Sequence, residues 1–131
     1  MTVTRRWWVT GLLVAGGWAG SRITRMEVVG DSMRPTLEPG DRLVLSRSRR
    51  IRPGDLVAVV DPRQARRIVV KRVAEVSPAG LTVLGDNPSA STDSRVFGPV
   101  SPAAVRGRVV YRYHPPPRRG RLSDGGVDRP L

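Results

Sequence analysis

The stretch RIVVKRVAEV, residues 67–76, has the composition of a β-strand. It is followed by the turn-forming sequence SPAG (77–80) and by a second apolar run, LTVL (81–84). Two runs rich in β-branched residues and joined by a short Pro/Gly turn predict an antiparallel hairpin. The first run also contains Lys71, which is the only lysine among 23 lysine and arginine residues. This stretch therefore bears on both the fold and the chemistry.

Further strands are predicted where short apolar segments are bounded by Pro, Gly and Asp. They cover residues 25–29, 42–46, 56–60 and 108–113. The sequences EPGD (38–41) and RPGD (52–55) place Pro and Gly as a type II turn requires. SPAAVRG (101–107) predicts one helical turn, with Ser101 as its cap and Pro102 as its first residue. We expect an all-β fold of small, mainly antiparallel, barrel-like sheets.

Residues 7–21, WWVTGLLVAGGWAGS, carry no charge and lie between Arg5/Arg6 and Arg22/Arg25. They predict a short N-terminal hydrophobic helix. Such a helix spans roughly 22 Å, which is short of the ~30 Å hydrocarbon core of a bilayer. Flanking arginines and tryptophans could extend its reach. Three interpretations stay open: a retained membrane anchor, a cleaved signal peptide, or a segment that is buried or lies on a surface.

A chain of 131 residues has room for one small domain. We expect an anchor-like segment at 1–23, the folded domain at 24–114, and a disordered, basic, Pro-rich tail at 115–131. The chain has no cysteine, which excludes disulfides and thiol catalysis. Its single histidine, His114, precedes three prolines and is poorly placed to serve as the base of a Ser-His-Asp triad.

The net charge of +12 is compatible with a nucleic-acid or lipid partner. The basic residues are scattered, however, with local clusters at 47–52, 63–67 and 118–121. Aromatic side chains, on which single-stranded nucleic acids stack, are nearly absent from the middle of the chain. We therefore expect no nucleic-acid partner.

Lys71 differs from the arginines in that a buried ammonium can lose its proton, whereas a guanidinium cannot. In a strand, residues 69, 71 and 73 share one face, so Lys71 would lie between Val69 and Val73. Apolar burial lowers the pKa of a lysine, and neighbouring arginines would add repulsion. A neutral amine within ~3 Å of a serine hydroxyl can take its proton. Lys71 is therefore a candidate base.

Two further segments supply candidate partners for Lys71. VVGDSMRPTLEPGD (28–41) contains a turn with Ser32, and LGDNPSASTDSRVFGPV (84–100) is a loop rich in hydroxyl groups. Together with PGDLV (53–57) and VKRV (70–73), these motifs resemble the type I signal peptidase family, whose members are membrane-bound serine proteases with a Ser/Lys dyad. The resemblance extends over about residues 26–111.

The resemblance implies a role for each matching residue. Ser32 would be the nucleophile and Lys71 the general base. Ser91 would hydrogen-bond the lysine amine, and Asp93 and Arg95 would form an ion pair behind it. The other supporting positions that the resemblance implies, including those of the oxyanion hole, are Gly30, Asp31, Asp86 and Asn87. No metal or cofactor is expected.

The resemblance also implies how a substrate would bind. A precursor protein would lie extended between the strands at 26–31 and 67–70 and would pair with their backbones. The residues expected to contact it are Val28, Val29, Met33, Ile68, Val69 and Val70. Shallow pockets would accept small side chains one and three positions before the scissile bond.

Two features depart from the family pattern. Position 30 is glycine, whereas the better-known bacterial branch has a serine there whose hydroxyl helps the oxyanion hole. The Gly-x-Pro-Gly-Asp stretch that usually follows the lysine segment is missing, as is the large second domain. This short form most resembles the compact subgroup thought to mature nickel-type superoxide dismutase.

The expected function is a membrane-associated serine endopeptidase that removes N-terminal signal or pro-segments. We expect a single-pass protein of the cell membrane, in contact with its lipid, with an extracytoplasmic catalytic domain. A cytoplasmic domain is the expectation if residues 7–21 do not span. Three alternatives stay open: a dedicated maturation protease for nickel-type superoxide dismutase, a non-enzymatic basic β-barrel that binds nucleic acid or anionic lipid, and a self-cleaving repressor-like protein.

Overall fold

The structure is a computed structural model that describes residues 23–47 and 50–122. The hydrophobic helix predicted at 7–21 and the end of the predicted tail, 123–131, lie outside these described residues. Among the residues that are described, there is no helix whose length and hydropathy would let it cross a membrane.

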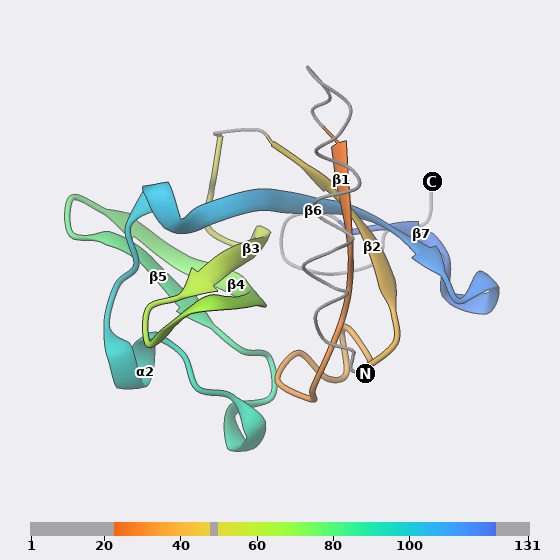
Figure 1. Cartoon of the computed structure of the whole chain (residues 1–131), viewed down its shortest axis with the longest axis horizontal. Helices are drawn as coiled ribbons and strands as arrows, with labels where there is room; N and C mark the ends of the chain where they lie inside the picture. The colour runs from red at the N-terminus through yellow and green to blue at the C-terminus, as the bar shows by residue number, and fades with distance from the viewer. Residues whose placement is uncertain (1–22, 48–49, 123–131) are drawn as a thin grey trace.

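The described residues form one mainly antiparallel sheet, which confirms the predicted all-β fold class. Its strands are β1 (Ile23–Glu27), β2 (Arg42–Ser46), β3 (Leu56–Asp61), β4 (Gln64–Ser77), β5 (Gly80–Leu84), β6 (Val105–His114) and β7 (Gly120–Arg121). The strand order is β1-β2-β6-β3-β4-β5, with β7 paired to β6. Figure 1 shows the long strand β6 crossing the molecule, with β3, β4 and β5 on one side and β1, β2 and β7 on the other.

Short helical turns lie in the connections. They are η1 (Pro88–Ala90), α2 (Ser94–Phe97), η2 (Pro102–Ala104) and η3 (Pro116–Arg118). The turn predicted after Ser101 is η2, and the Ser101 side chain caps it by accepting a hydrogen bond from the Ala103 N–H.

The two Pro-Gly-Asp turns have the same construction. Gly40 and Gly54 have φ angles of 94° and 96°, a region that glycine adopts readily and other residues rarely adopt. The Asp41 and Asp55 carboxylates each accept an N–H from the residue three positions earlier, at 2.9 and 2.8 Å. These turns lie directly before β2 and β3 and set where the two strands begin.

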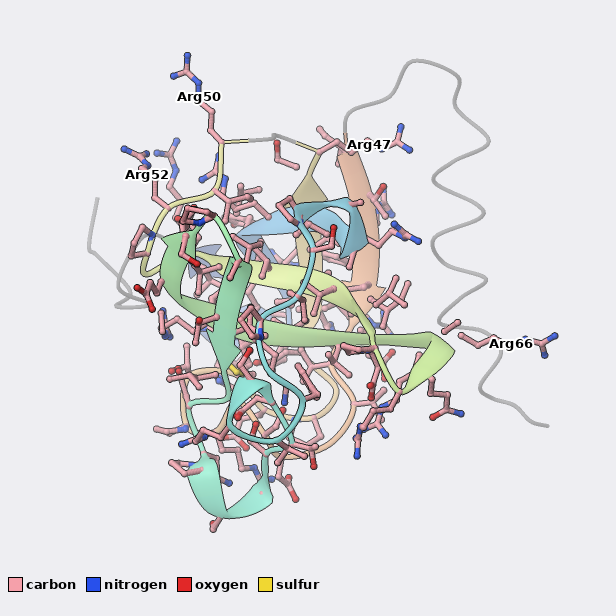
Figure 2. The ribbon with its side chains drawn as sticks, turned by 90° about the vertical axis from the view of Figure 1, so that its left-hand side faces the viewer. Arg47, Arg50, Arg52 and Arg66 are labelled. Atoms are coloured by element: carbon pink, nitrogen blue, oxygen red, sulfur yellow. The ribbon has the colours of Figure 1, made fainter. Side chains whose placement is uncertain are left out.

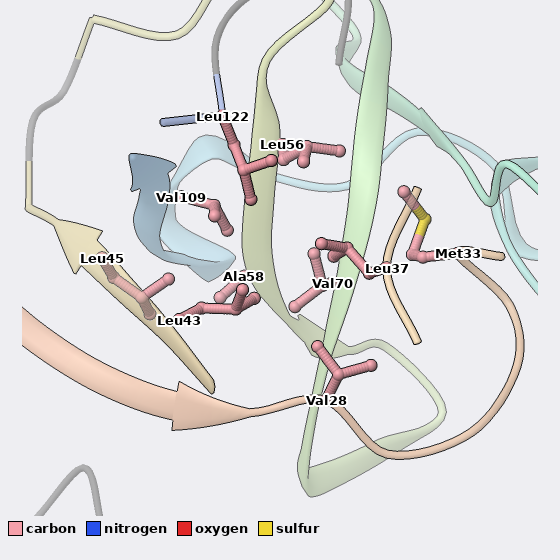
Figure 3. Close-up of a cluster of buried hydrophobic side chains, with 10 residues drawn as sticks. All are labelled: Val28, Met33, Leu37, Leu43, Leu45, Leu56, Ala58, Val70, Val109 and Leu122. Atoms are coloured by element: carbon pink, nitrogen blue, oxygen red, sulfur yellow. The ribbon is translucent and has the colours of Figure 1, made fainter. Parts of the chain in front are cut away.

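Two hydrophobic clusters lie on opposite faces of the central strands. The first consists of Val28, Met33, Leu37, Leu43, Leu45, Leu56, Ala58, Val70, Val109 and Leu122 (Figure 3). The second consists of Val57, Val59, Val73, Leu81, Val83 and Val100. Because successive residues of a strand point to opposite faces, β3 and β4 contribute to both clusters. These two strands are therefore held from both sides.

The ordered domain continues beyond His114, although a disordered tail was predicted from residue 115 onward. Residues 115–122 include η3 and β7, and Leu122 is buried in the first cluster. Buried Asp41 accepts hydrogen bonds from the Arg118 guanidinium at 3.0 Å and from Arg112 at 3.4 Å. Arg112 also donates to the Thr36 carbonyl at 3.0 Å. A Pro-rich segment without periodicity is thus held to the domain by the buried Leu122 side chain, the Arg118–Asp41 ion pair and the pairing of β7 with β6.

Arginine side chains project from several parts of the surface. Figure 2 shows Arg47, Arg50 and Arg52 around one end of the molecule and Arg66 on the hairpin between β3 and β4. The positive charge is therefore spread over the domain, as the sequence indicates.

We expect Leu122→Ala to lower the free energy of unfolding by about 2–5 kcal/mol, because it leaves a cavity in the first cluster. Urea denaturation of the purified protein measures this change. The matched control is Val76→Ala, at a position that is 47% exposed, and it should change stability by less than about 0.5 kcal/mol. Equal effects of the two substitutions would contradict the placement of Leu122.

Candidate active site

Lys71 lies on β4 directly opposite Val57 of β3, on the face that carries the second hydrophobic cluster. Val69 and Val73 are its neighbours on this face, and Lys71 itself is only 3% exposed. The alternation of the strand thus buries a lone lysine among valines.

The Lys71 amine takes part in a chain of hydrogen bonds. Its Nζ donates to Ser91 Oγ at 2.9 Å, and Ser91 Oγ donates to Asp93 Oδ2 at 2.8 Å. The buried Asp93 carboxylate also accepts the Gly85 N–H at 2.7 Å and two bonds from the Arg95 guanidinium at 2.6 and 3.0 Å. Because a hydroxyl has one proton, which Ser91 gives to Asp93, its oxygen is left to accept from the lysine.

The surroundings of Lys71 favour the neutral amine, chiefly because the side chain is buried. Burial is the largest cause and lowers the pKa of Lys71; the Asp93 carboxylate opposes this, and Arg67 adds to it by repulsion. The net result is a pKa below the ordinary value of 10.5. Burial raises the pKa of Asp93, but hydrogen bonds from Arg95, the Gly85 N–H and Ser91 outweigh it, so the pKa of this carboxyl lies well below its usual range. Asp93 therefore stays charged.

Ser32 lies in the turn that follows β1. Gly30 enters this turn with a φ of 86°, a conformation that side chains other than glycine rarely adopt. The Asn87 N–H donates to the Ser32 carbonyl at 2.8 Å, and the Asn87 side chain donates to the Asp31 carbonyl at 3.0 Å. The serine turn is thus attached to the loop that follows β5.

Ser32 and Lys71 line the same cavity, whose volume is about 350 Å³. Within residues 23–47 and 50–122, no hydrogen bond joins the Ser32 hydroxyl to the Lys71 amine, and the Ser32 hydroxyl and N–H have no protein partner. Catalytic hydrogen bonds often form only when substrate is bound. Both groups of Ser32 are therefore available to a ligand.

The other predicted site residues divide into two groups. The cavity is also lined by Val28, Val29, Gly30, Asp31, Met33, Ile68, Val69 and Val70. Ser91, Asp93 and Arg95 do not line it but form the hydrogen-bonded chain behind Lys71. The structure thus brings the expected substrate-binding residues, together with Gly30 and Asp31, to one cavity, and Ser91, Asp93 and Arg95 to the back of the lysine.

The sequence matches one family over most of its length. Residues 12–110 match the Peptidase S24-like family. The chain belongs to this family. It is therefore a serine-type peptidase, as predicted, and the alternative of a non-enzymatic basic module is set aside.

Several curated proteins are similar to this peptidase. It is 35% identical to the mitochondrial ATP-independent inner membrane protease subunit 1a of Arabidopsis thaliana, over 76% of each chain. It is 31% identical to the mitochondrial inner membrane protease subunit 2 of Danio rerio, over 72% of this chain and 66% of the relative. It is 30% identical to the mitochondrial inner membrane protease subunit 1 of Homo sapiens, over 76% of this chain and 71% of the relative.

A second set of polar contacts, centred on Asp86, connects the lysine strand to the serine turn. Asp86 accepts from the Arg72 Nε at 2.9 Å and from the Thr36 hydroxyl at 2.6 Å. Burial raises the pKa of Asp86, but the hydrogen bonds from Arg72 and Thr36 outweigh it and lower the pKa. From the sequence we expected Arg72 only to add repulsion near Lys71, and Thr36 had no predicted role. The sequence signal for the Arg72 contact is the position of this arginine, directly after the lysine in the VKRV motif.

Gly85 fills a place where no side chain fits. A Cβ at this position would lie 2.1 Å from Ser91 Oγ and 2.7 Å from the Ser32 carbonyl oxygen. The backbone at Gly85 therefore sets how closely the Ser91 and Ser32 segments approach each other.

We expect Gly85→Ala to lower peptidase activity by about 100-fold or more, because displacement by even 1 Å disrupts a catalytic arrangement. Kinetic assay of the purified protein measures the loss, and circular dichroism checks the fold. Gly120→Ala is the matched control, because a Cβ at Gly120 meets nothing within 4 Å. Normal activity in the Gly85 variant would mean that this close approach is unimportant.

The lowered pKa of Lys71 predicts a pH dependence of stability. Between the folded pKa and 10.5, the unfolded chain binds more protons at this position than the folded one, so the free energy of unfolding should rise with pH. Lys71→Met should remove this contribution and flatten the rise. Urea denaturation at several pH values below 10.5 measures it, and identical slopes for both proteins would show that Lys71 is not perturbed.

Proposed function

We propose that this peptidase is a Ser/Lys endopeptidase that cleaves N-terminal signal or pro-segments from precursor proteins at a membrane. The observation that carries the proposal is the buried Lys71 amine, held by Ser91 and facing the same cavity as the unpartnered Ser32 hydroxyl. The names of the relatives, which are inner membrane protease subunits, support the same class of activity.

In the first step, Ser32 Oγ attacks the carbonyl carbon of the scissile bond while neutral Lys71 accepts the hydroxyl proton. The protonated Lys71 then gives this proton to the departing amine, and the amino-terminal fragment stays on Ser32 as an ester. In the second step, Lys71 takes a proton from water, which attacks the ester and releases the fragment. The proton returns to Ser32 Oγ.

The surroundings of Lys71 suit this role. Because burial disfavours the ammonium, a larger fraction of the enzyme molecules has Lys71 as the neutral amine. A neutral amine that donates one N–H to Ser91 retains a lone pair that can accept the Ser32 proton. The Ser32 N–H, which has no partner among the described residues, would donate to the oxyanion that forms during attack.

The walls of the cavity suit an extended peptide. β1 is an edge strand, and the part of β4 before Arg72 pairs with β3 but, among the described residues, not with β5. Both strands therefore leave backbone groups that a substrate strand can pair with. Val28, Met33 and Ile68 give this cavity an apolar lining, which would suit the small side chains that the family resemblance implies near the scissile bond.

We assign the protein to the cell membrane, with residues 7–21 as a single-pass anchor and the catalytic domain outside the cytoplasm. This assignment is supported by the uncharged stretch between arginines and by the inner-membrane location in the names of the relatives.

Two substrate classes fit the proposal: secretory precursors in general, and a dedicated precursor such as that of nickel-type superoxide dismutase. The sequence LGDNPSASTDS (84–94) resembles that subgroup and so supports the dedicated class. Incubation with both kinds of precursor, followed by mass spectrometry of the products, separates them.

We expect Ser32→Ala and Lys71→Arg to remain folded, the second at some cost in stability because position 71 is buried, but both to lose precursor cleavage. The first removes the nucleophile, and the second keeps a positive charge but removes a base whose contribution is typically about 10²–10⁴-fold. Mass spectrometry of a precursor incubated with the full-length protein in detergent measures cleavage. Ser77→Ala, on the β4–β5 turn outside the cavity, is the control and should be active. Full activity of Lys71→Arg would rule out the dyad.

A further inference from the structure

The cavity extends from the catalytic pair toward the hairpin between β3 and β4. Three arginines of this hairpin, Arg63, Arg66 and Arg67, line its wall, which we call the arginine wall. Figure 2 shows Arg66 projecting outward from the hairpin. The wall is therefore a basic surface that a bound substrate would pass on its way to the active site.

The carboxylates that line the cavity do not neutralise the whole wall, because each already has an arginine partner. These pairs are Glu27–Arg42 at 3.8 Å, Asp31–Arg34 at 3.3 Å and Asp61–Arg63 at 3.5 Å. Within the described ranges, neither Arg66 nor Arg67 has a carboxylate within 4.0 Å. Arg66 and Arg67 therefore give the cavity positive charge that is not paired with a carboxylate of the described residues.

Arg67 is the better placed of the two for substrate recognition. It lies on β4 four residues before Lys71, a separation of about 13 Å in an extended strand. Its charge acts on the Lys71 amine, which indicates that the two side chains share one electrostatic environment. A substrate in the extended conformation also rises by about 3.3 Å per residue. Arg67 would therefore lie beside a substrate residue about four positions from the reacting carbonyl.

We propose that Arg67 selects precursors with an acidic side chain four or five residues before the scissile bond. This inference rests on the proposed function, and it places the substrate segment before the cut along β4. A guanidinium recognises a carboxylate through paired hydrogen bonds, and like charge disfavours lysine at the same position.

The test uses three synthetic peptides with alanine one and three positions before the intended cut. They carry glutamate, alanine or lysine at the fourth and fifth positions. We expect the full-length protein in detergent to cleave the glutamate peptide about threefold to fivefold faster in kcat/KM than the alanine peptide, the range that an exposed ion pair supports. The lysine peptide should be the slowest, and added salt should reduce the differences.

Substitutions at Arg67 link this preference to the proposed contact. Arg67→Ala should abolish the preference, and Arg67→Glu should reverse it. Comparing peptides within each variant cancels any effect of position 67 on the basicity of Lys71. Arg121→Ala, at an exposed position on β7 that does not line the cavity, should leave the preference unchanged.

Different failures have different meanings. Equal cleavage of the three peptides, or a preference that survives Arg67→Ala, overturns the inference and leaves the proposed function standing. If the wild-type protein cleaves neither these peptides nor intact precursors, the proposed function fails and the inference falls with it. If Arg67→Ala instead lowers cleavage of all peptides equally, and only with phosphatidylglycerol vesicles present, Arg67 serves a lipid surface and the inference is overturned.

Discussion

The hydrogen bond from Ser91 to the buried Asp93 carboxylate is the contact on which the site depends. A buried charge is tolerated only when its partners are in place, and Asp93 has them in Gly85, Ser91 and Arg95. Because Asp93 stays charged, it fixes the direction of the Ser91 proton. The Ser91 oxygen must then accept from Lys71. The Asp93 carboxylate thus determines how the Lys71 amine is oriented, although two hydrogen bonds separate them.

The loop after β5 connects the two halves of the site. Asp93 acts on the lysine side through Ser91, whereas Asp86 joins Arg72 of β4 to Thr36 of the serine turn. The two aspartates are close in sequence, but Asp93 acts on the lysine, whereas Asp86 bridges the lysine strand and the serine turn. The sheet supplies the remaining constraint, because the burial that stabilises the second hydrophobic cluster also makes the Lys71 ammonium unfavourable. Stability and reactivity therefore depend on the same packing.

Local sequence patterns predicted most of the strands and the burial of Lys71, because alternation in an apolar strand is visible without knowing its neighbours. The contacts between distant segments were less accessible. The Thr36–Asp86 bond joins residues fifty positions apart, and the narrow space at Gly85 exists only once two loops meet. Residues 115–122 have no periodicity, and it is the pairing of β7 with β6, the burial of Leu122 and the contact of Arg118 with Asp41 that show that they belong to the domain.

β4 is long enough to serve different purposes along its length. Its middle part is packed from both sides and carries Lys71, so substitutions there disturb packing and chemistry together. Its first residues, on the hairpin with β3, are exposed and lie outside both clusters. Mutations at this tip leave both clusters intact and can therefore accumulate at little cost to folding. If Arg67 selects the precursor as we propose, changes in the hairpin would alter this choice without repacking the strand around Lys71.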